Sequence, residues 1–222
     1  MEAGPIGQGL SLPEAILLLA LDDETGEPVG RRGMAAGLAL AAAVLMELAL
    51  AGRLDTDLER LEVAGREATG DAVLDAALAR LPPGAMPSAQ ALTVVAGAES
   101  GLRAALLDGL VARGLLRRQE GRFLWVFPDR RYPKSGGREA AQALRARLRE
   151  VVLEDGIPEP REALLIGLAR ASGLLPLLFG AAELAAAAPR LEAVFRLEAL
   201  NRSLGAALGD LYAARLRAGS LG

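Results

Sequence analysis

The sequence contains no cysteine and no histidine, and these two absences exclude several classes of active site. Disulfide bonds, thiolate nucleophiles, serine–histidine relays and histidine-ligated metals each need one of the two residues. Carboxylates, tyrosine, arginine and one lysine remain for acid–base chemistry, and no convincing carboxylate pair stands out among them. We therefore expect a protein that is not an enzyme and that has no catalytic residues, cofactor or metal.

Lysine and aromatic residues are also scarce. Lys134 is the only lysine among the 25 Lys and Arg residues, and the aromatic residues are one Trp, two Tyr and four Phe. The formal net charge of −3 argues against nucleic acid as a partner, because nucleic-acid-binding domains carry an excess of positive charge. The largest positive excess lies between Arg113 and Lys134, where seven basic residues accompany two acidic ones.

A long alanine-rich stretch, residues 34–51, is the main apolar segment of the chain. Its eighteen residues include eight alanines and one charged residue, Glu47. A helix that is apolar on every side is buried in a protein core or in a bilayer. Alanine contributes little to membrane insertion, and a buried glutamate is costly there. The composition therefore favours the central helix of a helical core over a membrane span.

Amphipathic patterns on both sides of this stretch predict a mainly α-helical fold. Ser11 and Glu14 form a capping box for a helix that begins at residue 12, and Thr69 or Asp71 caps another. Residues 53–65 alternate weakly and predict a short hairpin around Asp55, Thr56 and Asp57. We expect residues 1–10 to form a flexible tail and residues 11–218 to form a single domain. Helices are predicted at 12–21, 34–51, 72–81, 87–97, 99–113, 137–155 and 161–178, the last with a break or kink at Pro176, and two last helices meet at Pro189. A solvated acidic turn is predicted at 22–26 and a loop at 128–137.

A second, aromatic hairpin is predicted at residues 115–127, with its turn at Glu120 and Gly121. It would carry aromatic and basic residues side by side: Phe123, Trp125, Phe127, Arg117, Arg118 and Arg122. Alternation alone does not decide whether the aromatic face is core, or a contact surface for a membrane or a second copy of the chain. The arginines, with Arg31, Arg32 and Arg103, would either bind an anion or keep the surface soluble.

The helix at 99–113 and this hairpin together are also typical of a winged-helix DNA-binding unit over residues 99–127. The helix would present a face to a DNA groove that is too acidic and too small to read bases: Glu99, Ser100, Arg103, Ala104 and Asp108. A DNA-binding regulator is therefore the alternative interpretation of this segment.

Several motifs occur in an order that resembles the Golgi phosphoprotein 3 family, which is known from yeast, animals and bacteria. They are LSLPEAILLLALDDETG at 10–26, GLALAAAVLMELALAGRL at 37–54, TGDAVLDAALARL at 69–81, LVARGLL at 110–116 and REALLIGLARASGLL at 161–175. The resemblance implies a single, mostly helical domain with a protruding hairpin. Eukaryotic members are peripheral membrane proteins that bind phosphatidylinositol 4-phosphate and the cytosolic tails of Golgi glycosyltransferases.

The resemblance also implies where a lipid headgroup would bind. The family pocket uses a tryptophan, an arginine in the central helix and two further arginines one turn apart, and these positions fall on Arg32, Ala41, Ser100 and Arg103. One of the four side chains, Arg103, is retained. By resemblance we expect a cytoplasmic protein, peripheral at the inner face of the membrane, that binds an anionic lipid such as a phosphoinositide with lower affinity or altered specificity. Arg103, Arg32 and Arg31 would contact the headgroup, and the hairpin would contact lipid or a second copy of the chain. Cytosolic tails of membrane proteins are a further expected partner.

Overall fold

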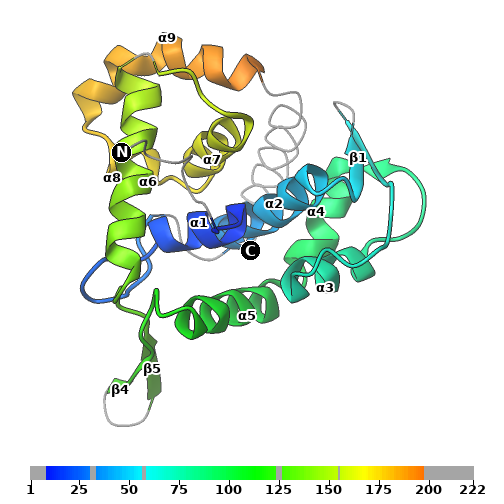
Figure 1. The fold of residues 1–222 in the computed structure, drawn as a ribbon, viewed down its shortest axis with the longest axis horizontal. Helices are drawn as coiled ribbons and strands as arrows, with labels where there is room; N and C mark the ends of the chain where they lie inside the picture. The colour runs from blue at the N-terminus through cyan, green and yellow to red at the C-terminus, as the bar shows by residue number, and fades with distance from the viewer. Residues whose placement is uncertain (1–8, 31–33, 57–58, 124–126, 155, 198–222) are drawn as a thin grey trace, which may run out of the picture.

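In the computed structural model, helices surround one central helix, and a two-stranded hairpin projects from the body (Figure 1). The structure describes residues 9–30, 34–56, 59–123, 127–154 and 156–197. Its elements are α1 (Leu12–Leu19), α2 (Met34–Leu50), β1 (Leu54–Thr56), β2 (Arg60–Val63), α3 (Ala72–Arg80), β3 (Met86–Pro87), α4 (Ser88–Ala96), α5 (Glu99–Ala112), β4 (Gln119–Phe123), β5 (Phe127–Arg131), α6 (Gly137–Leu153), α7 (Pro160–Ala171), α8 (Leu175–Leu178) and α9 (Ala181–Leu197). The mainly helical fold is confirmed.

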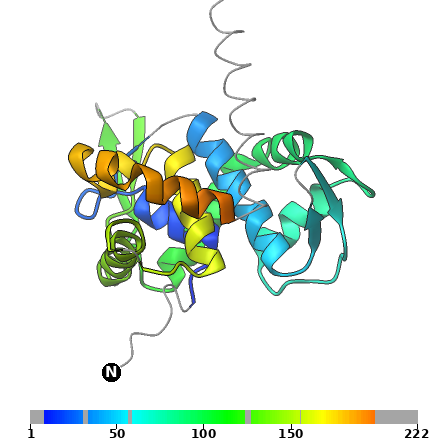
Figure 2. The same cartoon turned by 90° about the horizontal axis from the view of Figure 1, so that it is seen from above.

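The central helix α2 contacts α1, α3, α4, α5, α7 and β1. Its small side chains let these neighbours approach closely, and Ala43, Val44 and Leu45 are fully buried. Among the described residues, no helix has both the length and the hydropathy that a bilayer span requires. The prediction that this stretch is the buried centre of a helical core is confirmed. Seen from above, α3, α4 and the small sheet lie on one side of α2, with α7 and α9 on the other (Figure 2).

The central helix also fixes the start of α1. The Ser11 N–H donates to Glu14 Oε2 at 2.8 Å, which confirms the capping interaction predicted for this pair. The neighbouring Leu12 N–H donates to Glu47 Oε2 of α2 at 2.6 Å. The Arg161 guanidinium of α7 binds the same Glu47 carboxylate with N–O distances of 2.6 and 2.8 Å. The one charged residue of α2 therefore joins three helices.

The first predicted hairpin is confirmed, but its predicted turn was wrong at Asp55 and Thr56, which lie in β1 and pair with Glu62 and Leu61. β1 pairs with β2, and β3 adds to β2 to complete a three-stranded antiparallel sheet. Asp71 is the cap of α3, since its carboxylate accepts hydrogen bonds from Val73 N and Leu74 N. The apolar face predicted for α3 is buried against the core.

The second predicted hairpin exists, but the predicted position of its turn was wrong. Glu120 and Gly121 lie within β4 and pair with Arg130 and Asp129 of β5, so part of the loop predicted at 128–137 is a strand. The base of the hairpin decides the register. Leu116 is buried and bridges to the buried Lys134, and this pairing continues along the ladder until the strands end at 123 and 127. The pairing of buried Leu116 with buried Lys134 therefore outweighs the local preference of Glu120 and Gly121 for a turn.

Two predicted helix ends were also wrong. The break in the segment 161–178 is at Gly173, whose φ of +70° follows the end of α7, and Pro176 instead lies in the first turn of α8. Pro189 lies inside the continuous helix α9. Burial of Ala187, Leu191 and Val194 along one face of α9 compensates for the hydrogen bond that proline cannot donate.

Candidate functional site

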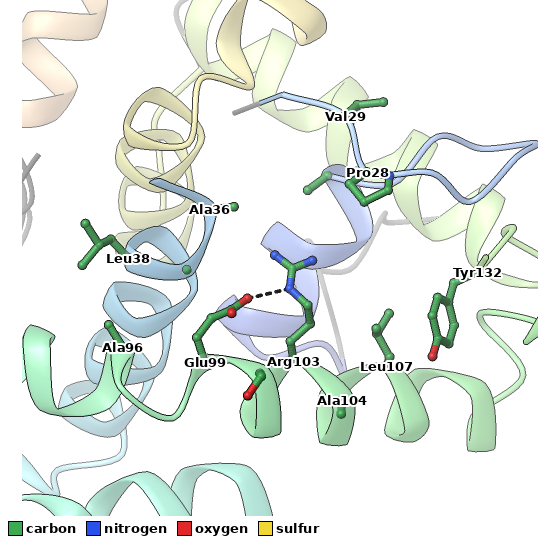
Figure 3. A pocket seen from close by; sticks show the side chains of 13 residues that line it. Pro28, Val29, Ala36, Leu38, Ala96, Glu99, Arg103, Ala104, Leu107 and Tyr132 are labelled. Carbon is green, nitrogen blue, oxygen red and sulfur yellow. Dashed lines mark hydrogen bonds and ion pairs between the residues drawn. The ribbon is translucent and has the colours of Figure 1, made fainter. Parts of the chain in front are cut away.

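A pocket of about 530 Å³ lies between the beginning of α2, the first half of α5 and the segment that leads out of α1. Most of its wall is apolar and small, and its polar side chains are Glu99, Ser100, Arg103 and Tyr132. Figure 3 shows Glu99 and Arg103 projecting from α5 into the space below Pro28 and Val29. The pocket therefore combines an apolar surround with two opposite charges.

Arg103 and Glu99 form an ion pair one helical turn apart on α5, with 2.7 Å between Arg103 Nε and Glu99 Oε1. About 28% of the Arg103 side chain and 31% of the Glu99 side chain are exposed. The pair uses one nitrogen of the guanidinium and one oxygen of the carboxylate. Among the described residues, nothing else hydrogen-bonds to the two terminal nitrogens of Arg103 or to Glu99 Oε2. Two cationic donors and one anionic acceptor therefore remain available in the pocket.

Gly37 of α2 makes room for the Glu99 side chain. A Cβ atom at position 37 would lie 3.0 Å from Glu99 Cγ, closer than side chains normally approach. The glycine in α2 thus allows the beginning of α5 to pack near α2 with a glutamate between them. This close contact fixes where the carboxylate enters the pocket.

The base of the hairpin completes the pocket by contributing Tyr132. The Tyr132 N–H donates to the carbonyl of Gly26, and a Cβ atom at position 26 would lie 2.1 Å from the backbone at Tyr132 and Pro133. Gly26 also has a φ of +67°. A residue without a side chain is therefore required where the 22–29 segment crosses the hairpin.

A partly buried ion-pair network, with Lys134 fully buried, holds the same crossing together. Lys134 Nζ donates to the Leu21 carbonyl at 2.6 Å and to Asp23 Oδ1, while Arg145 of α6 binds both oxygens of Asp23 at 2.8 Å. Arg145 and Lys134 stabilise the ionised carboxylate and hold the pKa of Asp23 far below its ordinary value. Burial lowers the pKa of Lys134, although Asp23 opposes this shift.

The prediction of a solvated turn at 22–26 is therefore corrected at Asp23. Sequence reasoning missed the network. The only signal in the sequence was a single lysine in a chain that otherwise uses arginine. Within the described residues, no group of three or more acidic side chains is placed to hold a metal ion.

The structure describes three of the four positions that the family pocket uses. Arg103 lines the pocket together with Ser100, whereas Ala41 is buried in the core and does not line it. Of the predicted headgroup residues, Arg31 and Arg32 lie outside the described residues.

The predicted hairpin surface is described only in part. Arg117 and Arg118 are exposed at the hairpin base, where Arg118 forms an ion pair with Asp108 of α5 that raises the pKa of the guanidinium. Trp125 lies outside the described residues. Only the backbone is described for the strand residues Arg122, Phe123 and Phe127.

Comparison with known proteins agrees with the motifs. The family model described as Golgi phosphoprotein 3 (GPP34) matches residues 12–215, which is nearly the whole chain. A search of curated proteins finds no match. The family match includes α2, α5, the hairpin and the pocket between them. The chain belongs to the Golgi phosphoprotein 3 family.

Proposed function

We propose that the protein is a non-enzymatic adaptor that associates peripherally with the cytoplasmic face of a membrane. It does so by binding the phosphate of an anionic phospholipid headgroup in the pocket at Arg103. The observation that carries the proposal is the half-buried guanidinium of Arg103, whose two terminal nitrogens have no partner among the described residues. A guanidinium with two free donors suits bidentate contact with phosphate oxygens.

Phosphoinositides are the first lipids to test, since eukaryotic members of the family bind phosphatidylinositol 4-phosphate. The pocket predicts weaker binding of that headgroup here. Glu99 lies beside Arg103, so a phosphate bound to Arg103 would lie close to the Glu99 carboxylate. Two negative charges about 4 Å apart repel by roughly 4 kcal/mol at the effective dielectric of a protein surface. Ser100 stands where the family has an arginine, so the described pocket offers one cation to a polyanionic headgroup.

The alternative of a DNA-binding regulator finds no support in α5. The exposed residues of this helix are Ser100, Gly101, Ala104, Ala105, Asp108 and Ala112. None of them is basic, and the one arginine of the helix faces the pocket. A recognition helix needs cationic or amide side chains on the face that enters the groove.

Co-sedimentation with liposomes of varied headgroup, at two salt concentrations, tests the proposed function. A charge-assisted contact contributes about 1.5–3 kcal/mol, so Arg103→Ala should weaken binding to anionic vesicles tenfold or more. Arg80→Ala removes the same charge from an exposed site on α3 and serves as the matched control. Equal binding by the two variants would show that the pocket is not the lipid site.

A further inference from the structure

The Glu99–Arg103 pair indicates which headgroup the pocket takes. We propose that the ligand is an aminophospholipid headgroup, an ethanolamine or serine ester of phosphate, with its phosphate on Arg103 and its protonated amine on Glu99. This inference rests on the proposed function, because it assumes that Arg103 binds a lipid phosphate. It adds a role for the carboxylate, which hinders binding of a purely anionic ligand.

The free hydrogen-bonding groups of the pair match such a headgroup. The ion pair leaves two donors on Arg103 and one acceptor, Oε2, on Glu99, all without partners among the described residues. A phosphate and an ammonium joined by a short carbon chain present the complementary acceptors and donors side by side. An ethanolamine ester of phosphate then neutralises both charges of the pocket without an unpaired charge on either side, and a serine ester brings one further carboxylate.

The remaining wall of the pocket suits a compact ligand of low net charge. Its other polar side chains are Ser100 and Tyr132, and the rest are alanine, glycine, proline, valine and leucine. A phosphorylated inositol ring would need several cations, and the described wall supplies one. An apolar wall around an ion pair lowers the local dielectric and so strengthens both charge contacts of a matched ligand.

The position of Glu99 is built into the packing of α2 against α5. Gly37 leaves space for the glutamate side chain, since a Cβ atom at position 37 would lie 3.0 Å from Glu99 Cγ and would require a small shift of one or the other. The close packing of α2 against α5 therefore leaves room for the glutamate at the pocket wall, where Arg103 binds its carboxylate. A glutamate that only stabilised α5, through an ion pair with the residue four positions later, would need no such space in α2.

The test compares vesicles that contain phosphatidylserine with vesicles that contain the same fraction of phosphatidylglycerol. Both lipids carry one negative charge, and only phosphatidylserine has an amine. The wild-type protein should bind phosphatidylserine vesicles about fivefold or more tightly. Glu99→Gln should abolish this preference, and Glu62→Gln, at an exposed position on β2, should keep it. Soluble glycerophosphoethanolamine should displace the protein from the vesicles, whereas glycerol phosphate at equal concentration should not.

The outcomes separate this inference from the proposed function. If the wild type binds neither lipid, or if Arg103→Ala binds as well as wild type, the proposed function itself fails. If binding depends on Arg103 but phosphatidylglycerol or phosphatidylinositol 4-phosphate binds as well as phosphatidylserine, the proposed function stands and the aminophospholipid inference is overturned. The same holds if Glu99→Gln strengthens binding to both lipids equally, because Glu99 would then only oppose anions.

Discussion

Replacement of Glu47 by alanine should destabilise the protein more than any change at an exposed acidic residue. The Glu47 carboxylate, with 11% of its side chain exposed, accepts from the Leu12 N–H and binds the Arg161 guanidinium. Alanine leaves the buried Leu12 N–H without an acceptor at the start of α1 and removes the partner of Arg161. Glutamine at position 47 would keep an acceptor for Leu12 and lose the charge.

The size of the effect follows from these contacts. An unsatisfied buried N–H costs about 1–3 kcal/mol. The ion pair adds about 1 kcal/mol, near the surface value, because 37% of the Arg161 side chain is exposed. The higher helix propensity of alanine recovers a few tenths of a kcal/mol. We expect a loss of about 2–4 kcal/mol for Glu47→Ala and about 1 kcal/mol for Glu47→Gln. For a chain of this length, the larger loss lowers Tm by roughly 5–15 °C.

Urea denaturation and thermal melts of both variants, followed by circular dichroism, measure these losses. Arg161→Ala and the double variant complete a thermodynamic cycle that isolates the ion pair from the Leu12 hydrogen bond. Glu139→Ala, an exposed position on α6, is the control. Melting of Glu47→Ala within about 2 °C of wild type would refute the reasoning, because Glu47 would then contribute nothing to the junction of α1, α2 and α7.

Three further predictions concern the hairpin and the turn that it crosses. The pKa of Asp23 is lower in the folded protein than its ordinary value of 3.8, so the stability that its network contributes is present above pH 3.8 and is lost as the pH falls below it. Urea titrations should therefore show that Asp23→Asn is less stable than wild type by about 2–3 kcal/mol at pH 7. The difference between the two proteins should shrink toward pH 2. Gly26→Ala should unfold at a markedly lower temperature than Gly52→Ala, since both glycines have a φ of +67° but only position 26 has backbone atoms within 4 Å of the added Cβ; equal melting temperatures would contradict this. Trp125→Ser with Phe127→Ser should weaken membrane binding or dissociate an oligomer with Tm changed by only a few degrees; a core role would instead cost about 3–5 kcal/mol and leave association unchanged.

The local sequence determined most of the helices. The apolar composition of residues 34–51 identified α2 as the central helix, and the spacing of leucines in α5 identified its buried face. The interactions at the starts of α1 and α3 were also predictable, because each joins side chains and backbone N–H groups within one helical turn. Resemblance to the family also predicted Arg103 as a headgroup-binding residue.

Tertiary structure decided the features that depend on residues far apart in the chain. Glu47 is 114 residues from Arg161, and Asp23 is 111 residues from Lys134, so no local pattern reveals either pair. The hairpin register follows from buried anchors at its base, which outweigh the turn preference of Glu-Gly. The pocket likewise forms only where α2, α5, the 28–29 segment and Tyr132 meet. Spacing on one helix places Glu99 beside Arg103, but only the packing of α2 against α5 directs both charges into one cavity.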